Sequence, residues 1–172
     1  MGWPEFHRRQ DIIQAVLRQA RRGPRDPLPF AGVPGAVEMF GTEQDLLLAL
    51  QHKWGQLLGG YLRAAVGDHV GGDADENADL VGEVSRAWQA ASREHETLRA
   101  VLDAHHERFP VVAEQRRAEL RLLVTTAGLA DPEEPVELVT RVGAVFDTLL
   151  RQRPSTRVEV MRGRRSLAKL SS

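Results

Sequence analysis

Residues 42–67 read TEQDLLLALQHKWGQLLGGYLRAAVG and carry the clearest pattern in the chain. Apolar side chains recur along them at intervals of three and four residues, the spacing that gathers side chains on one face of an α-helix. Thr42 is a suitable N-cap, Asp45 stands where a capping-box partner belongs, and Gly67 is a suitable end. These residues predict one long amphipathic helix. Its expected apolar positions are Leu46, Leu47, Leu50, Trp54, Leu57, Leu58, Tyr61, Leu62 and Ala65.

Helical patterns continue on both sides of this stretch. Before it, residues 4–20 predict a first helix. After it, the spacing predicts a helix over 77–105 that bends near Ser92, and another over 110–128. Residues 131–152 begin with Asp-Pro-Glu-Glu, which combines an N-cap, a proline at the first helical position and an acidic first turn. The fold class expected is therefore all-α, a helical bundle of about six to eight helices.

Proline and glycine divide the chain. Residues 23–35 contain four prolines and three glycines, which predicts a linker with at most a turn of helix. We divide the chain into an N-terminal region (1–45), a helical body (46–152) and a basic tail (153–172). Within the tail, Arg157–Met161 is the one segment whose pattern could add a short strand.

The formal net charge of −1 hides a segregation of charge along the chain. The first 25 residues carry a net +4, residues 26–150 carry −11, and residues 151–172 carry +6. Basic ends favour a polyanion or an acidic partner protein, although arginine-rich ends also simply keep a protein in solution. One hypothesis is accordingly an adaptor whose basic tail docks onto an acidic partner.

Composition excludes several classes of protein. The 172 residues include no cysteine, which rules out disulfide frameworks, thiolate zinc sites and cysteine nucleophiles. The N-terminus lacks the apolar segment of a signal peptide, and no apolar run reaches the roughly 18–20 residues of a membrane span. We therefore expect a cytoplasmic protein that does not contact the membrane.

The search for catalytic and metal-binding motifs gives no support for an enzyme. Six histidines are present, but they show neither an HExxH pattern nor paired Glu-x-x-His motifs. The segment 73–79 places acidic residues as a calcium loop does, but Ala78 and Val84 stand where that loop needs glycine and a bidentate glutamate. No phosphate-binding loop, dinucleotide fingerprint or serine-nucleophile motif occurs. We expect no cofactor and no metal.

Three segments carry a resemblance to a known family. RRQDIIQAVL (8–17), FAGV (30–33) and FGTEQDLLL (40–48) occur in an order that resembles TetR-type transcriptional regulators. There, the corresponding segments are the first helix, the turn of the helix-turn-helix and the start of the long connecting helix. The resemblance covers the chain up to about residue 152. It implies a helical body that binds a ligand and dimerises.

The same region departs from the family where DNA would be contacted. Three prolines between residues 24 and 29 fall where the second helix should run, and an interior proline costs a helix about 3 kcal/mol. The would-be recognition helix is shortened and contains Pro34. Val37 and Glu43 stand where the family usually has phosphate-contacting tyrosine and lysine. A carboxylate repels the DNA backbone, so we expect a degenerate helix-turn-helix without normal DNA binding.

The resemblance also suggests where a site would lie. Pocket-lining candidates in the helical body are Trp54, Tyr61, Trp88 and His105, since small-molecule pockets are mostly apolar with a few polar groups. The alternative is that these side chains are ordinary core. The helix over 131–152 is apolar on two faces, which favours a homodimer through it and the preceding helix. The interface candidates are Leu123, Val139, Val142, Phe146 and Leu149.

The function expected from these features is that of a non-enzymatic, TetR-like regulatory protein. It would sense a small apolar ligand or a protein partner as a dimer. The first alternative is a working DNA-binding repressor of the TetR type. A metal-dependent helical-bundle enzyme is a third class, and it has the least support from the residues.

Overall fold

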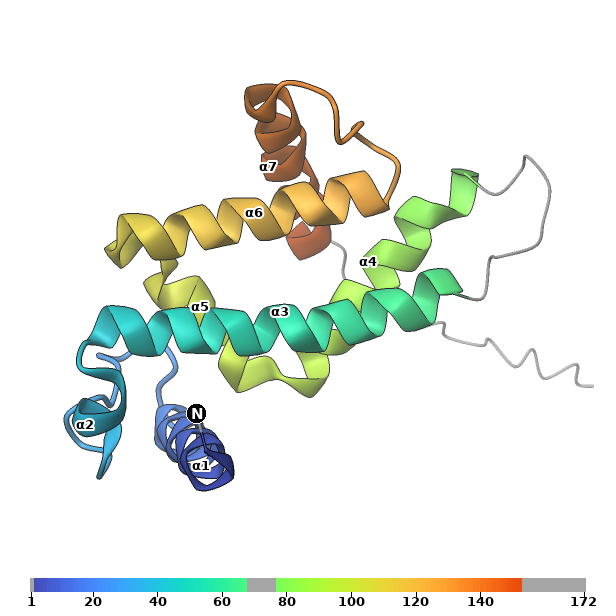
Figure 1. Ribbon diagram of the computed structural model, residues 1–172. Helices are drawn as coiled ribbons and strands as arrows, with labels where there is room; N and C mark the ends of the chain where they lie inside the picture. The colour runs from blue at the N-terminus through green and yellow to red at the C-terminus, as the bar shows by residue number, and fades with distance from the viewer. Residues whose placement is uncertain (1, 68–76, 153–172) are drawn as a thin grey trace, which may run out of the picture.

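The computed structural model describes residues 2–67 and 77–152 and is helical throughout (Figure 1). The elements are α1 (Trp3–Ala20), α2 (Ala36–Phe40), α3 (Glu43–Gly67), α4 (Asn77–Glu94), α5 (Glu96–His105), a 3-10 turn η1 (His106–Arg108), α6 (Pro110–Thr126) and α7 (Val136–Gln152). The described ranges contain seven α-helices and no strand, which confirms the all-α prediction. The segment 68–76 and the tail 153–172, with the strand considered at 157–161, lie outside the described residues.

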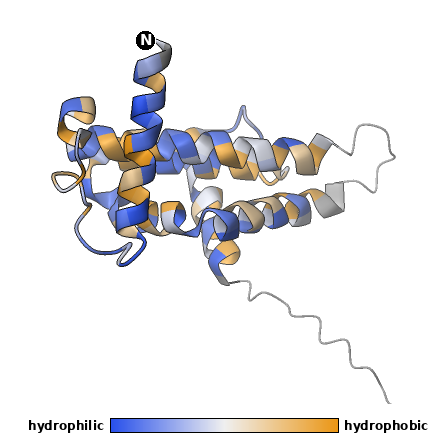
Figure 2. Cartoon of the chain, turned by 90° about the horizontal axis from the view of Figure 1, so that it is seen from below, coloured by the Kyte–Doolittle hydropathy of each residue, from blue (hydrophilic) through white to orange (hydrophobic). Residues whose placement is uncertain are grey.

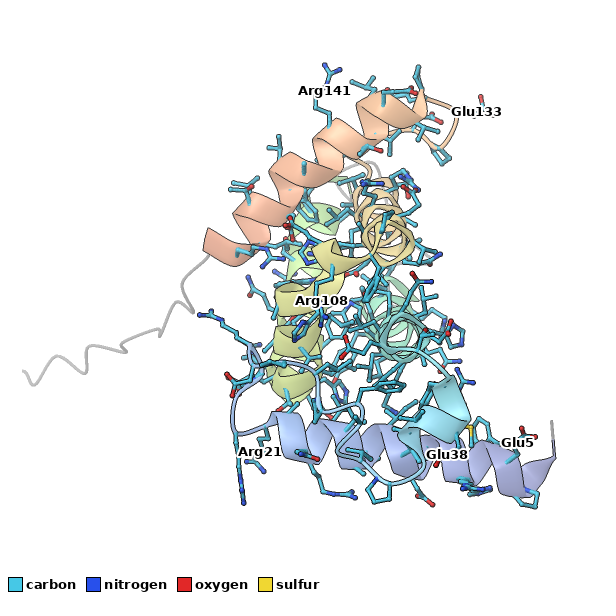
Figure 3. The ribbon with its side chains drawn as sticks, turned by 90° about the vertical axis from the view of Figure 1, so that its left-hand side faces the viewer. Glu5, Arg21, Glu38, Arg108, Glu133 and Arg141 are labelled. Carbon is cyan, nitrogen blue, oxygen red and sulfur yellow. The ribbon has the colours of Figure 1, made fainter. Side chains whose placement is uncertain are left out.

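The helices are arranged around α3 and α6. α3 packs against α4, α5 and α6, while α7 packs on α6. α1 lies on one side of this central pair and α7 on the opposite side (Figures 1 and 3). Hydrophobic and hydrophilic segments alternate along each helix, as expected for amphipathic helices that share one core (Figure 2).

The long helix α3 supplies much of the core. Its N-terminus is capped as predicted: Asp45 N donates to Thr42 Oγ1 at 3.1 Å, and Thr42 Oγ1 donates to Asp45 Oδ2 at 2.6 Å. Fully burying a leucine side chain contributes about 1.5–3 kcal/mol, so this face contributes substantially to stability. The residues that α3 buries are Leu46, Leu47, Ala49, Leu50, Gln51, Trp54, Leu58 and Leu62.

The bend expected near Ser92 occurs at His95. Its backbone, with φ −115° and ψ 41°, lies outside the helical region and separates α4 from α5. The end of α6 matches the sequence: Gly128 has a positive φ of 67°, and Leu129 N donates to Val124 O at 2.9 Å. This is the Schellman arrangement that favours glycine.

The last helix begins later than predicted. The sequence places its start at Asp131 and Pro132, whereas α7 begins at Val136. Asp131 caps a separate turn, in which its Oδ1 accepts from Glu133 N at 2.8 Å. Pro135 explains the difference, because a proline disfavours helical geometry in the residue before it and is well suited to starting a helix. The prediction overlooked this second proline.

The N-terminal region has a very short second helix. No helix occurs between Arg21 and Gly35, in agreement with the proline-rich linker predicted there. α2, which follows, has five residues, and both its ends are glycines with positive φ, Gly35 and Gly41. The segment that the TetR resemblance predicts as a recognition helix is thus little more than one turn.

Candidate functional site

A buried carboxylate lies at the centre of the bundle. Glu119 on α6 is only 7% exposed. Its Oε1 accepts hydrogen bonds from Trp54 Nε1 at 2.9 Å and Arg99 Nη1 at 3.3 Å, and it pairs with Arg116. Its Oε2 accepts from Gln51 Nε2 at 2.9 Å. Side chains from α3, α5 and α6 therefore converge on one carboxylate.

The contacts continue around a closed circuit of six charged side chains, which we call the charge ring. α5, α6 and α7 each contribute one arginine and one acid. Arg99 pairs with Asp103, which accepts from Arg151 at 2.9 Å. Arg151 also donates to Asp147 at 3.0 Å, and Asp147 pairs with Arg116. The members of the charge ring, in order, are Glu119, Arg99, Asp103, Arg151, Asp147 and Arg116.

The electrostatics of the charge ring favour the ionised forms. Burial alone would raise the pKa of Glu119, but the charges of Arg116 and Arg99 outweigh it and hold that pKa below its ordinary value. At Asp103 burial is likewise opposed by Arg99 and Arg151, and the pKa of Asp103 is also lowered. Burial alone would lower the pKa of Arg151, but the attraction of Asp103 and Asp147 together outweighs it, and the pKa is raised.

This arrangement holds the helices together and offers no reacting group. Every carboxylate of the charge ring is engaged by arginine, so none is free to act as a general base. The guanidinium of Arg99 also stacks on the indole of Trp54, 5.1 Å from the ring centroid. Breaking a buried pair is costly, which gives the charge ring a structural role in fixing α5, α6 and α7.

The four pocket-lining candidates do not meet in one cavity. Trp54 is fully buried and bonded to Glu119, and Trp88 is buried in the core on α4. His105 is buried too, with Nε2 3.1 Å from the carbonyl oxygen of Asp26. Tyr61 is half-buried and donates to Glu94. Trp88 lines a surface cleft with Asp103 and Arg151, and none of the other three candidates lines that cleft.

The five dimer candidates divide between the core and the surface. Leu123, Val139 and Phe146 are buried within the protomer, where they pack α6 and α7 together. Val142 is half-buried and Leu149 is exposed. Both apolar faces of α7 show helical spacing. The sequence alone therefore did not indicate which face packs against this chain and which remains exposed.

An apolar face of α7 is left uncovered by the rest of the described chain. Leu138, Val145 and Leu149 are 40%, 61% and 55% exposed, and Val142 lies between them in the helical register. We call these four residues the α7 face. It lies on the outside of the bundle, where Arg141 of the same helix points away from the other helices (Figure 3).

The surface that would read DNA is small and carries negative charge. α2 exposes Val37 and Glu38, and Figure 3 shows Glu38 next to α1. Glu43, at the start of α3, is paired with Arg108 at 2.8 Å. The carboxylate of Glu43 is thus engaged within the same chain.

In residues 2–67 and 77–152, no three His, Asp or Glu side chains cluster so as to hold a metal ion. Over the same ranges, no helix combines the length and apolarity needed to cross a membrane.

The comparisons with known proteins give no relative. No protein-family model matches the chain, and the searches of curated proteins and of solved structures found no match. The resemblance to TetR-type regulators therefore stays a prediction based on residues 8–48.

Proposed function

We propose that this chain is a non-enzymatic helical binding protein that acts as a homodimer, with a second copy covering the α7 face. The observation that carries the proposal is the exposed apolar register of α7. Leu138, Val142, Val145 and Leu149 follow one another at intervals of four, three and four residues, which is the seam of a coiled-coil pairing. Three of the four expose 40% or more of their surface.

The register of these residues favours a second copy as the occupant. An antiparallel pairing of two α7 helices about a two-fold axis near Gly143 and Ala144 sets Leu138 opposite Leu149 of the partner subunit. The same axis sets Val142 opposite Val145 of the partner subunit. The face is therefore complementary to itself, as a two-fold interface requires.

Sedimentation equilibrium of the full chain tests the proposal. The wild type is expected to be a dimer at micromolar concentration, and Val145→Glu a monomer, because a charge would be buried at the centre of the seam. Val37→Glu is the matched control: Val37 is also exposed, at 46%, but lies on α2, on the opposite side from α7. A monomeric wild type, or a Val145→Glu variant that stays dimeric, would overturn the proposal.

A further inference from the structure

We propose that a cleft between α1, α3 and the start of α5 binds a small molecule that carries two or more anionic groups. The inference rests on the proposed binding function and names its ligand class, without depending on the dimer. The cleft has a volume of about 540 Å³. This volume is within the range of small-molecule sites.

The cleft gathers positive charge from separate elements. Arg18 and Arg21 come from the end of α1, Lys53 from the middle of α3 and Arg93 from the end of α4. The three arginines have no ion-pair partner among the residues that the structure describes, unlike the arginines of the charge ring. Unpaired guanidinium groups match carboxylates and phosphates, which they bind through two parallel hydrogen bonds.

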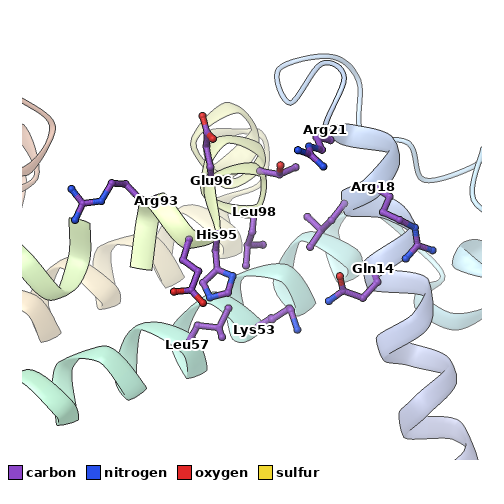
Figure 4. A pocket seen from close by; sticks show the side chains of 12 residues that line it. Gln14, Arg18, Arg21, Lys53, Leu57, Arg93, His95, Glu96 and Leu98 are labelled. Atoms are coloured by element: carbon purple, nitrogen blue, oxygen red, sulfur yellow. The ribbon is translucent and has the colours of Figure 1, made fainter. Parts of the chain in front are cut away.

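Gln14 and Arg21 extend from α1 into the space between the helices, whereas Arg18 extends on the side of α1 away from α5 (Figure 4). Figure 4 shows Arg21 extending from α1 toward the start of α5. In the same view Gln14 and Lys53 point toward each other across the gap between α1 and α3. Lys53 Nζ donates to Gln10 Oε1 at 3.3 Å, a neutral acceptor that leaves its charge uncompensated. Cations thus approach the cleft from two sides, which favours a ligand with more than one anionic group.

The two carboxylates of the cleft cancel only half of this charge. Glu94 is held by the hydroxyl of Tyr61, which donates to it, and this hydrogen bond raises the pKa of Tyr61 above its ordinary value. Glu96 extends from the start of α5 away from Lys53 and Gln14 (Figure 4). Four cations and two carboxylates line the cleft, so its lining carries a net charge of +2, with Arg93 extending away from His95 (Figure 4).

The remaining lining suits the organic part of such a ligand. Leu17, Leu57 and Leu98 line the same cleft and supply apolar contact. His95 makes no side-chain cap at the start of α5, and the cleft lies against that first turn. The N–H groups at a helix start favour negative charge, which adds to the attraction of the arginines.

Calorimetric titration with two probes, citrate and inorganic pyrophosphate, tests the proposal. We expect saturable binding of at least one probe to the full chain. Arg18→Gln combined with Arg21→Gln is expected to weaken it about tenfold or more, since two charge-assisted contacts are lost. Lys53→Gln is expected to weaken it as well. The folded structure is not at risk, because Arg18 and Arg21 are exposed.

Arg22→Gln combined with Arg25→Gln is the matched control. It removes the same charge from the neighbouring segment, and neither residue lines the cleft. Binding within about twofold of the wild type is expected for this pair, because distant exposed charges are screened by salt. Binding of citrate alone identifies a carboxylate ligand, binding of pyrophosphate alone a phosphate ligand, and either supports the proposal.

Two outcomes would overturn the inference. One is the absence of saturable binding of both probes, and the other is equal weakening by the two arginine pairs, which would indicate diffuse attraction to a basic surface. The Val145→Glu variant separates this proposal from the dimer. It is expected to keep the affinity of the wild type for the probe, because the α7 face lies on the opposite side of the bundle from α1.

Discussion

The indole Nε1 of Trp54 donates a hydrogen bond of 2.9 Å to the carboxylate of Glu119, and this contact joins α3 to α6 inside the core. Glu119 also accepts hydrogen bonds from Gln51, Arg99 and Arg116, so the contact with Trp54 connects the apolar centre of the bundle to the charge ring. A buried polar group of this kind is favourable only while all its partners are present. The stability of the bundle is therefore expected to be sensitive to substitution of Glu119 or of its hydrogen-bond partners.

Replacing Glu119 by glutamine should destabilise the fold strongly. The substitution keeps the shape of the side chain but removes one of the two acids that each of Arg99 and Arg116 contacts, leaving them with Asp103 and Asp147 alone. Breaking a buried ion pair costs about 3–5 kcal/mol, so a loss of this size in the free energy of unfolding is expected. Urea denaturation followed by circular dichroism measures it.

Glu114→Gln is the control for this substitution. Glu114 lies on the same helix and also pairs with two arginines, Arg117 and Arg121, but half of its side chain is exposed. Exposed pairs contribute about 0–1 kcal/mol, so the loss should stay within that range. Equal losses for Glu114→Gln and Glu119→Gln would mean that burial of the charge ring is unimportant.

Helical spacing predicted most of the fold because most of the helices are amphipathic and bury one apolar face in a shared core. The capping of α3 by Thr42, the end of α6 at Gly128 and the lack of helix in the proline-rich linker all followed from local chemistry. The predicted start of the last helix at Asp131 was wrong, because Pro135 moves the first helical residue to Val136. Local signals locate a helix, whereas a competing proline or cap determines its first residue.

The charge ring was missed because charged residues are usually expected at the surface. Yet Val112, Arg116, Glu119 and Leu123 follow one another at intervals of four, three and four residues and share the buried face of α6. An arginine and a glutamate on an apolar stripe are the signal that would have found them. Their partners lie on other helices, far away in sequence, so the pairing itself required the structure.

Lowering the pH below 6.5 should reduce stability through His105. Burial and the charge of Arg108 lower the pKa of His105 below its ordinary value of 6.5. Between 6.5 and that lowered pKa, the unfolded chain binds a proton that the folded chain does not, so the free energy of unfolding falls as the pH falls. The contribution is complete above pH 6.5.

The measurement is urea denaturation at a series of pH values from 7.5 downward. His105→Gln should remove the slope that lies just below pH 6.5, while its amide keeps a donor for the carbonyl oxygen of Asp26. Losses at still lower pH belong to Glu119 and Asp103, whose lowered pKa values place their effect below 4.5 and 3.8. An unchanged slope in His105→Gln would remove His105 as the cause.

The chain is not expected to select a DNA sequence. α2 has five residues and exposes Val37 and Glu38, whereas base recognition needs a helix that reaches into the major groove. Incubation of the full chain with a pool of random duplexes at physiological salt should enrich no sequence. Enrichment of one sequence that is lost on substitution of Glu38 or Val37 would establish a working DNA reader.

Filling Gly143 should force α6 and α7 apart. A Cβ at this position would lie 3.1 Å from Leu120 Cβ and 3.4 Å from the Leu120 carbonyl carbon, and backbone atoms cannot yield as the end of a side chain can. Overpacking of this kind costs about 1–3 kcal/mol, so Gly143→Val should lose that much stability in thermal or urea denaturation.

Gly60→Val is the comparison, because Gly60 on α3 is also helical and a Cβ there meets nothing within 4 Å. Its stability should stay within about 0.5 kcal/mol of the wild type. Matching losses for the two variants would mean that the contact between α6 and α7 is not the cause.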